Sequence, residues 1–493
     1  MRAGAELRRV GRIDRRALLV LGLTTALVTA GCTDEAGSVS ASPSASASAS
    51  PSPSASASAS ASGESGSVSA SASGEVSKTI SQPVVPSRIP VAPESERVDL
   101  TMPTFSDPTN VTNPLFPVSL QESVLMLGRV DGKPFRTEVT LLPETRIIEW
   151  AGQRVETLVS QYNAYLDGRI EEVAYDYYAQ ADDGSVWYFG EDVFDFRDGA
   201  VVVTEGTWLA GRDGPAAMIM PGDPQIGDVY RTENAPGFVF EEVTVRSVDE
   251  QLDGPMGPID GGLLAEELHS DGTTEQKIFA PGYGEFYTSG GGDVEALALA
   301  VPTDAISERV PPELTALSGG ALDVFDTAGS GDWKAASATV RDMEAAWDTV
   351  RSGDVPRLIE PRMEEALRVL ARTVRSRQGA AARGAAIQAA RSSFDLQLPY
   401  RPAAEIDLAR MDLWAAQLLV DEAAGVAGGV GADAFALDYV RDRIRAAVDA
   451  GDLIRINTEL GTIQVAVVDE ELALAAAAAG RLRSTLADIR PTT

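Results

Sequence analysis

The stretch "YDYYAQADDGSVWYFGEDVFDFRDG", residues 175–199, shows how the first half of the chain folds. It holds eight aromatic rings and seven carboxylates in 25 positions. In the run 169–180 the odd positions from Val173 to Ala179 are apolar or aromatic, whereas the even positions are mostly polar. Successive side chains of a strand point to opposite faces of a sheet, so this alternation predicts a half-buried strand.

Turn residues separate this strand from others like it. Asp-Gly occurs eight times between residues 131 and 272 and nowhere later in the chain. This dipeptide readily adopts the positive φ angles of tight hairpin turns. Between the turns we expect strands at 154–166, 169–180, 185–189, 200–209, 238–248, 262–270 and 273–280. The spacing predicts an antiparallel β-meander, curled into a half-barrel or a closed barrel that hides its edges.

After about residue 331 the apolar residues recur at helical spacing. Trp333, Val340, Met343 and Trp347 lie on one stripe of a helix. A second helix is expected to begin near Asp354, and further helices near 380–396, 402–424, 432–449, 452–467 and 469–488. The pattern predicts a bundle of six or seven helices with Trp347 and Trp414 in its core. The fold class is therefore α+β in separate domains, with an antiparallel β domain followed by an all-α bundle.

The N-terminus carries an export signal. Six arginines within residues 1–16 precede an apolar run at 17–31, which is too short to span a membrane comfortably. The end of that run, "VTAGC", resembles the lipobox of bacterial lipoproteins, which implies that Cys32 is acylated and becomes the N-terminus. The stretch "DRRALL" also resembles a twin-arginine export motif, and a Sec signal with an arginine-rich start is the alternative.

Residues after Cys32 are almost entirely Ser, Ala and Pro, a composition that cannot bury enough apolar surface to fold. We therefore divide the chain into a signal peptide (1–31), a disordered tether (32–96), a β domain (97–302), a linker (303–330) and a helical bundle (331–493). The acylated cysteine predicts a lipid-anchored protein on the extracytoplasmic face of the cell membrane, with the bilayer as one partner.

Charge narrows the range of other partners. The chain carries a net charge of −32, and residues 97–302 hold 36 acids against 12 bases. Nucleic acid is excluded as a partner, because binding phosphates requires a basic face. A small cationic molecule, a metal ion or a basic protein would be attracted to the β domain. Acidity that only keeps an exported protein soluble is the alternative.

Few catalytic mechanisms fit the residue inventory. His269 is the only histidine, which excludes a multi-histidine metal site and argues against Ser-His-Asp catalysis. Its position beside "SDG" predicts a surface or turn residue. A carboxylate pair drawn from Glu191, Asp195 and Glu205 could hydrolyse glycosides. The segments "ADDGS" (181–185) and "EDVFDFRDG" (191–199) could supply oxygen ligands to Ca²⁺, although without the spacing of an EF-hand loop.

Rings on both faces of the 175–199 segment exceed what one core needs. Aromatic platforms beside carboxylates suit sugars and cationic ligands. The candidate ligand-binding residues are Tyr178, Trp187, Tyr188, Glu191, Asp195 and Trp208, with simple core packing as the alternative.

The run "YDYYAQADDGSVWYFGED", continuing to "TEGTWLAGRDG", resembles a domain of bacterial secreted proteins and lipoproteins that brings no established activity. We expect a non-catalytic lipoprotein that binds a small molecule, a glycan or a protein. The alternative is a carboxylate-dependent hydrolase of cell-wall glycans.

Overall fold

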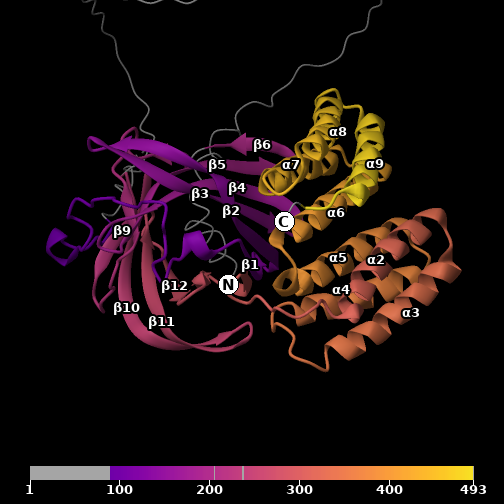
Figure 1. Cartoon of the computed structure of the whole chain (residues 1–493), viewed down its shortest axis with the longest axis horizontal. Coiled ribbons are helices and arrows are strands. Elements are labelled where there is room, and N and C mark those ends of the chain that lie inside the picture. The colour runs from indigo at the N-terminus through magenta and orange to yellow at the C-terminus, as the bar shows by residue number, and fades with distance from the viewer. Residues whose placement is uncertain (1–88, 205, 236–237, 492–493) are drawn as a thin grey trace, which may run out of the picture. The chain divides into compact units, whose positions relative to one another are not determined.

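An antiparallel sheet occupies residues 123–301 in the computed structural model, which describes residues 89–204, 206–235 and 238–491 (Figure 1). Two short 3-10 helices, η1 (Glu94–Glu96) and η2 (Val118–Leu120), precede it. Its fourteen strands within the described residues are β1 (Ser123–Val130), β2 (Lys133–Trp150), β3 (Gln153–Leu166), β4 (Arg169–Gln180), β5 (Val186–Arg197), β6 (Ala200–Val203), β7 (Trp208–Leu209), β8 (Ala217–Met220), β9 (Val229–Ala235), β10 (Val239–Gly254), β11 (Gly257–His269), β12 (Thr274–Ala280), β13 (Gly284–Gly290) and β14 (Asp293–Val301).

The sheet is open. Its strand order is β6-β5-β4-β3-β2-β1-β14-β13-β12-β11-β10-β9, with the short strands β7 and β8 paired to β5. The two ends of this path, β6 and β9, do not pair with each other. Of the two expected forms, the half-barrel is therefore correct and the closed barrel is wrong. Strand β8 pairs with β5 and also contacts the end strand β9, so it lies between these two strands.

The prediction that Asp-Gly pairs form hairpin turns is confirmed at some positions and wrong at others. At Asp131, Asp167 and Asp198 the aspartate and the following glycine both have positive φ, as a type I′ hairpin turn requires. Ala151-Gly152 forms the same kind of turn between β2 and β3 without the Asp-Gly signature. The pairs at Asp253 and Asp260 are not turns, because they lie inside β10 and β11.

Eight helices follow within the described residues, namely α2 (Pro312–Ser330), α3 (Trp333–Val350), α4 (Glu360–Arg375), α5 (Gly379–Gln397), α6 (Ala403–Ala423), α7 (Ala427–Ile444), α8 (Ala450–Val468) and α9 (Leu472–Asp488), with a 3-10 turn η3 (Leu398–Tyr400) between α5 and α6. The expected linker at 303–330 is wrong over most of its length, because α2 fills it. The expected start of a helix near Asp354 is also wrong. Pro361 lacks an N–H and fits only the first turn, so α4 begins beside it, at Glu360.

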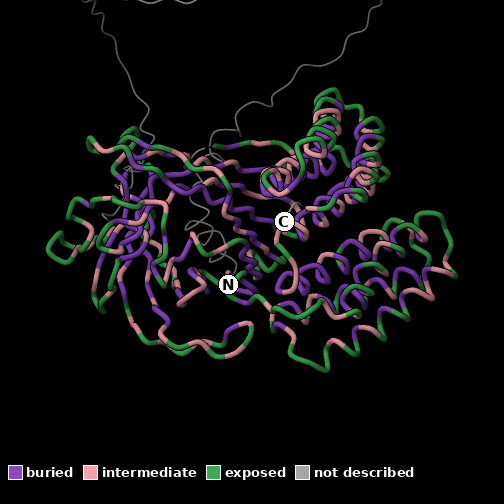
Figure 2. The backbone as a smooth tube through the Cα atoms, viewed as in Figure 1, coloured by how far each residue is buried: buried purple, intermediate pink, exposed green. Residues whose placement is uncertain are grey.

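The helices pack against one face of the curved sheet, and the opposite face lines the inside of the curve. Leu125 and Leu127 of β1 pack with α2–α5, and Tyr165 of β3 packs with α6–α9, where its ring stacks on Trp414 at 5.3 Å. Trp347 and Trp414 are both buried, as expected. We call the helix-covered side the outer face and the opposite side the inner face. Figure 2 shows the buried positions concentrated along the strands and on the helix sides that face one another.

A buried ion network joins the outer face to the helices. Glu138 on β2 accepts a hydrogen bond from Arg443 of α7 at 2.6 Å. Arg136, two residues before it, donates to Asp395 of α5 at 2.7 and 2.8 Å. Arg410 of α6 completes the network by donating to Asp395 at 3.2 Å. Moving a helix away from the sheet would leave a buried charge without its partner, which is strongly destabilising. The network therefore fixes the position of the helices against the sheet.

Several expectations lie outside the described residues. These are the signal peptide (1–31), acylation of Cys32, the tether as far as residue 88, and Glu205. The last part of the expected disordered tether, residues 89–96, is wrong, because it is ordered against the sheet, where Ala92 N donates to Glu242 at 2.7 Å. Among the residues that the structure does describe, no helix is both long and apolar enough to cross a membrane.

Candidate functional site

The inner face of the sheet borders a cavity of about 200 Å³. Strands β1–β5 and β8–β13 form its wall, together with the segment 116–121. Seven carboxylates line it against one amine, Lys277; they are Glu172, Asp176, Glu191, Glu233, Glu241, Glu267 and Glu285. Six aromatic rings join them, namely Phe116, Tyr162, Tyr178, Tyr188, Phe279 and Tyr283. The cavity is therefore acidic and aromatic at once.

A bulge in β5 creates the part of this wall that the sequence segment 175–199 supplies. Asp176 of β4 lies opposite Glu191 of β5, and Tyr178 of β4 lies opposite Tyr188 of β5. Between these two pairs β4 advances by two residues and β5 by three. The extra residue falls at Gly190, which has φ +115°, a conformation that favours glycine. Strict alternation would put Glu191 and Tyr188 on opposite faces. The bulge brings both into the cavity wall.

The aromatic rings form a connected wall. Tyr178 and Tyr188 stack with ring centroids 5.0 Å apart. Phe116 packs edge-on against Tyr178 at 5.1 Å and contacts Phe279 at 6.4 Å on the far side of the cavity. Trp208 supports Tyr188 from the core at 5.4 Å. Such faces offer a rigid π surface to an apolar or cationic group.

Carboxylates face one another across neighbouring strands. Residues directly opposite in an antiparallel pair share a face, and their Cβ atoms lie about 4.5–5.5 Å apart. Four such acid pairs occur on the inner face, namely Glu172 with Asp195, Asp176 with Glu191, Glu233 with Glu241, and Glu267 with Glu275. Like charges directly opposite destabilise a sheet. The inner face thus concentrates negative charge that a bound cation would offset.

One tyrosine lies in the middle of this charge. The Tyr188 hydroxyl donates a hydrogen bond to Asp176 Oδ1 at 2.7 Å. Burial raises the pKa of Tyr188 well above its usual value, and the nearby charges of Asp176, Glu191 and Glu233 raise it further. Tyr188 therefore remains protonated and acts as a hydrogen-bond donor. Because β9 carries Glu233, the charges at this point come from both ends of the sheet.

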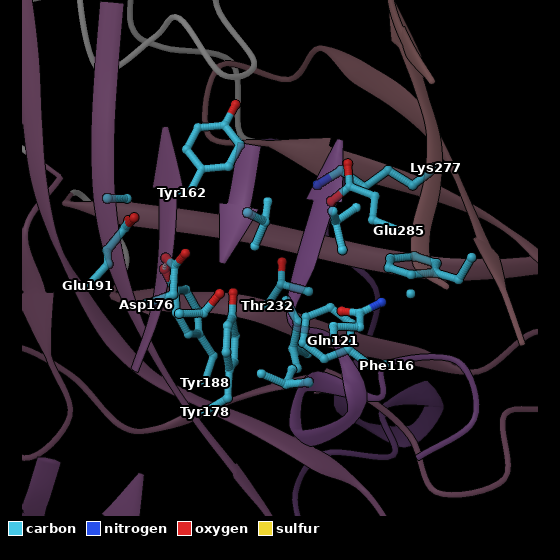
Figure 3. Close-up of a pocket in the computed structure, with 18 of the residues that line it drawn as sticks. Phe116, Gln121, Tyr162, Asp176, Tyr178, Tyr188, Glu191, Thr232, Lys277 and Glu285 are labelled. Carbon is cyan, nitrogen blue, oxygen red and sulfur yellow. Dashed lines mark hydrogen bonds between the residues drawn. The ribbon is translucent and has the colours of Figure 1, made fainter. Parts of the chain in front are cut away.

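Lys277 lies across the cavity from that group, beside Glu285 (Figure 3). Its ammonium is 2.6 Å from Glu267 Oε2. Burial lowers the pKa of Lys277, but Glu267, Glu285 and other carboxylates outweigh that effect and raise it. Burial, helped by Glu241, raises the pKa of Glu267 to about 7. Burial would lower the pKa of His269, but Glu241 and neighbouring carboxylates raise it to about 9.

The structure brings three of the six candidate binding residues into the cavity wall, namely Tyr178, Tyr188 and Glu191. Trp187 and Trp208 are buried in the core instead, where Trp187 donates its indole N–H to Ser185 at 2.9 Å. Asp195 shares the inner face through its pairing with Glu172 but is not part of the cavity lining. Of the three carboxylates considered for hydrolysis, Glu191 alone is a described residue that lines the cavity.

Two further expectations concern the carboxylates considered as Ca²⁺ ligands and the position of His269. In the segment 181–185, Asp182 accepts hydrogen bonds from Thr104 and Ser106, and Asp183 accepts them from Ser185, so both carboxylates secure loop conformations. The expected surface position of His269 is wrong, whereas the expected turn position is confirmed in part, because the His269 carbonyl accepts a hydrogen bond from Gly272 N at 2.9 Å. His269 is the last residue of β11 and is only 3% exposed, because it lies on the inward side of that strand.

Sequence reasoning missed the acids of β9–β12, although β11 carries a readable pattern. Leu263 and Ala265 are fully buried, and Glu267 and His269 continue the same alternation. A charged side chain at an apolar position of a strand indicates a polar group turned inward. No comparable pattern marks Glu233, whose place beside Tyr188 depends on how the whole sheet curves.

A scan against protein-family models and a search of curated proteins find no match for this chain.

Proposed function

We propose that this protein is a membrane-tethered extracytoplasmic lipoprotein that binds a small organic cation on the inner face of its sheet. The observation that carries the proposal is the set of inward-facing acid pairs beside a wall of aromatic rings. Carboxylates attract a positive charge, and tyrosine and phenylalanine faces hold it by cation–π contact and exclude water. The resemblance of "VTAGC" at residues 28–32 to a lipobox supports the tether.

The arrangement favours an organic cation over an anion. Seven carboxylates and one lysine give the lining a strong excess of negative groups. An anionic ligand would meet repulsion on every side except at Lys277, which Glu267 already pairs at 2.6 Å. A ligand with an ammonium or guanidinium head and an apolar body matches both kinds of wall residue.

Isothermal titration of the purified protein tests this proposal. We would compare choline, putrescine and arginine methyl ester with 3,3-dimethylbutanol, the neutral isostere of choline. At least one cation should bind, and the neutral isostere should bind tenfold more weakly or not at all. Native mass spectrometry of protein purified from its host would weigh any ligand retained from the cell. A retained anion, or a neutral isostere that binds as tightly as choline, would contradict the proposal.

Variants localise the binding. Asp176→Asn and Glu191→Gln remove one charge each from the wall, and each should weaken cation binding by about tenfold or more, since 1.4 kcal/mol corresponds to a factor of ten. Glu149→Gln is the matched control, because that side chain is 80% exposed on β2 and its removal should leave affinity unchanged.

A further inference from the structure

Three side chains lie close enough to share one ion where β10 begins and β11 ends. Glu241 is directly opposite His269, and Glu267 lies two residues before His269 on the same face of β11. One carboxylate oxygen of each glutamate and one ring nitrogen of His269 all lie within 4.8 Å of one another. The three come from paired strands, so the backbone ladder holds them in place.

His269 supplies a second and independent observation. Its side chain is buried, and neither ring nitrogen makes a hydrogen bond. The nearest carboxylate oxygens are 3.5 Å from Nδ1, on Glu241, and 3.8 Å from Nε2, on Glu275. Both are close enough for an ion pair with a charged imidazole but lie beyond the usual hydrogen-bond length. Buried imidazole nitrogens in native proteins are normally bonded. A metal ion between His269 and the glutamates would satisfy one nitrogen directly.

The donor set indicates which ions fit. Imidazole favours first-row transition metals such as Zn²⁺ over Ca²⁺ and Mg²⁺, which prefer oxygen ligands throughout. One histidine and two carboxylates are three protein ligands, which leaves a further coordination position. Glu241 and Glu267 both line the cavity, so an ion could reach them through it. Lys277 shares the Glu267 carboxylate and competes with an ion there.

We propose that Glu241, Glu267 and His269 bind one divalent first-row transition metal, with Zn²⁺ as the preferred ion. This site is distinct from the group around Asp176 and Glu191, and it does not depend on the binding of an organic cation.

The experiment uses the full-length protein after treatment with EDTA and dialysis. Zn²⁺, and separately Ca²⁺, is titrated by calorimetry, while the ring of the single histidine, labelled with ¹³C, is observed by NMR without a histidine tag. Zn²⁺ should bind at one ion per chain and shift or broaden the His269 signal, and Ca²⁺ should do neither. His269→Gln and Glu241→Gln should each weaken Zn²⁺ binding at least tenfold.

Two controls separate this site from the rest of the cavity. Asp176→Asn, which is expected to lose the organic cation, should keep its Zn²⁺ affinity, and so should the surface variant Glu149→Gln. The NMR experiment on the unaltered protein needs no variant to fold. The proposal is overturned if one equivalent of Zn²⁺ leaves the His269 signal unmoved, or if folded His269→Gln binds Zn²⁺ as tightly as the unaltered protein.

Discussion

Replacing Glu191 by glutamine should make the protein more stable. The Glu191 side chain is 4% exposed and faces Asp176 directly across β4 and β5. Cβ atoms of directly opposite residues lie about 5 Å apart. Two unit charges at that spacing repel by about 3 kcal/mol at an effective dielectric constant of about 20. An exposed like-charge pair across two strands lowers the free energy of unfolding by less than about 1 kcal/mol. Because this pair is buried, we expect Glu191→Gln to raise the free energy of unfolding by about 1–3 kcal/mol at pH 7.5.

Urea denaturation followed by tryptophan fluorescence measures the change, provided that the slope with urea stays the same in both proteins. Glutamine keeps one acceptor oxygen of similar reach, so packing is largely preserved.

A loss of stability of 1 kcal/mol or more in Glu191→Gln at pH 7.5, with no change in the surface control Glu149→Gln, would contradict the expected gain. A gain in stability that accompanies a loss of cation binding would identify the acid pair as a feature kept for binding at the expense of folding.

Other predictions follow from the same structure. In the metal-free protein the single histidine signal should titrate near pH 9, because Glu241 holds the charged form of His269; a midpoint near 6.5 contradicts this. Glu267 has its pKa raised to about 7, so its contribution to stability is complete below about pH 4.5 and is lost as the pH rises through 7; Glu267→Gln should flatten the stability profile over that range. Arg443→Ala should lower the free energy of unfolding by about 3–5 kcal/mol, because it leaves Glu138 buried without its closest cation. Gly190→Ala should lower the melting temperature strongly and weaken binding, since a Cβ atom there would lie 2.1 Å from the Trp208 carbonyl oxygen; a change of less than 2 °C would contradict it.

The sequence predicted the two kinds of architecture because each has its own local period. The alternation from Val173 to Ala179 and the turn at Asp167 are both local features, and strand β4 follows from them. The helical stripe through Trp333 and Trp347 likewise places α3. Departures occur where one residue overrides a pattern, as Pro361 does at the start of α4.

The candidate site was only partly predictable because it joins segments far apart in the chain. Glu233 of β9 raises the pKa of Tyr188 of β5, although 45 positions separate them. That proximity depends on the curvature of a fourteen-strand sheet, which a short stretch of sequence does not determine. The bulge at Gly190 is the other obstacle, since alternation alone separates Tyr188 from Glu191. By contrast, the inward position of Glu267 could have been found from the apolar residues that share its side of β11.

The buried ion network also limits how far the β half and the helical half can be separated in evolution. Arg136 and Glu138 belong to the β half, whereas Asp395, Arg410 and Arg443 belong to the helical half. A gene fragment encoding either half alone would produce a protein with several charges stripped of their partners. Recombination between the two halves should therefore be rare, and a natural chain that has this sheet without these helices should carry neither Arg136 nor Glu138.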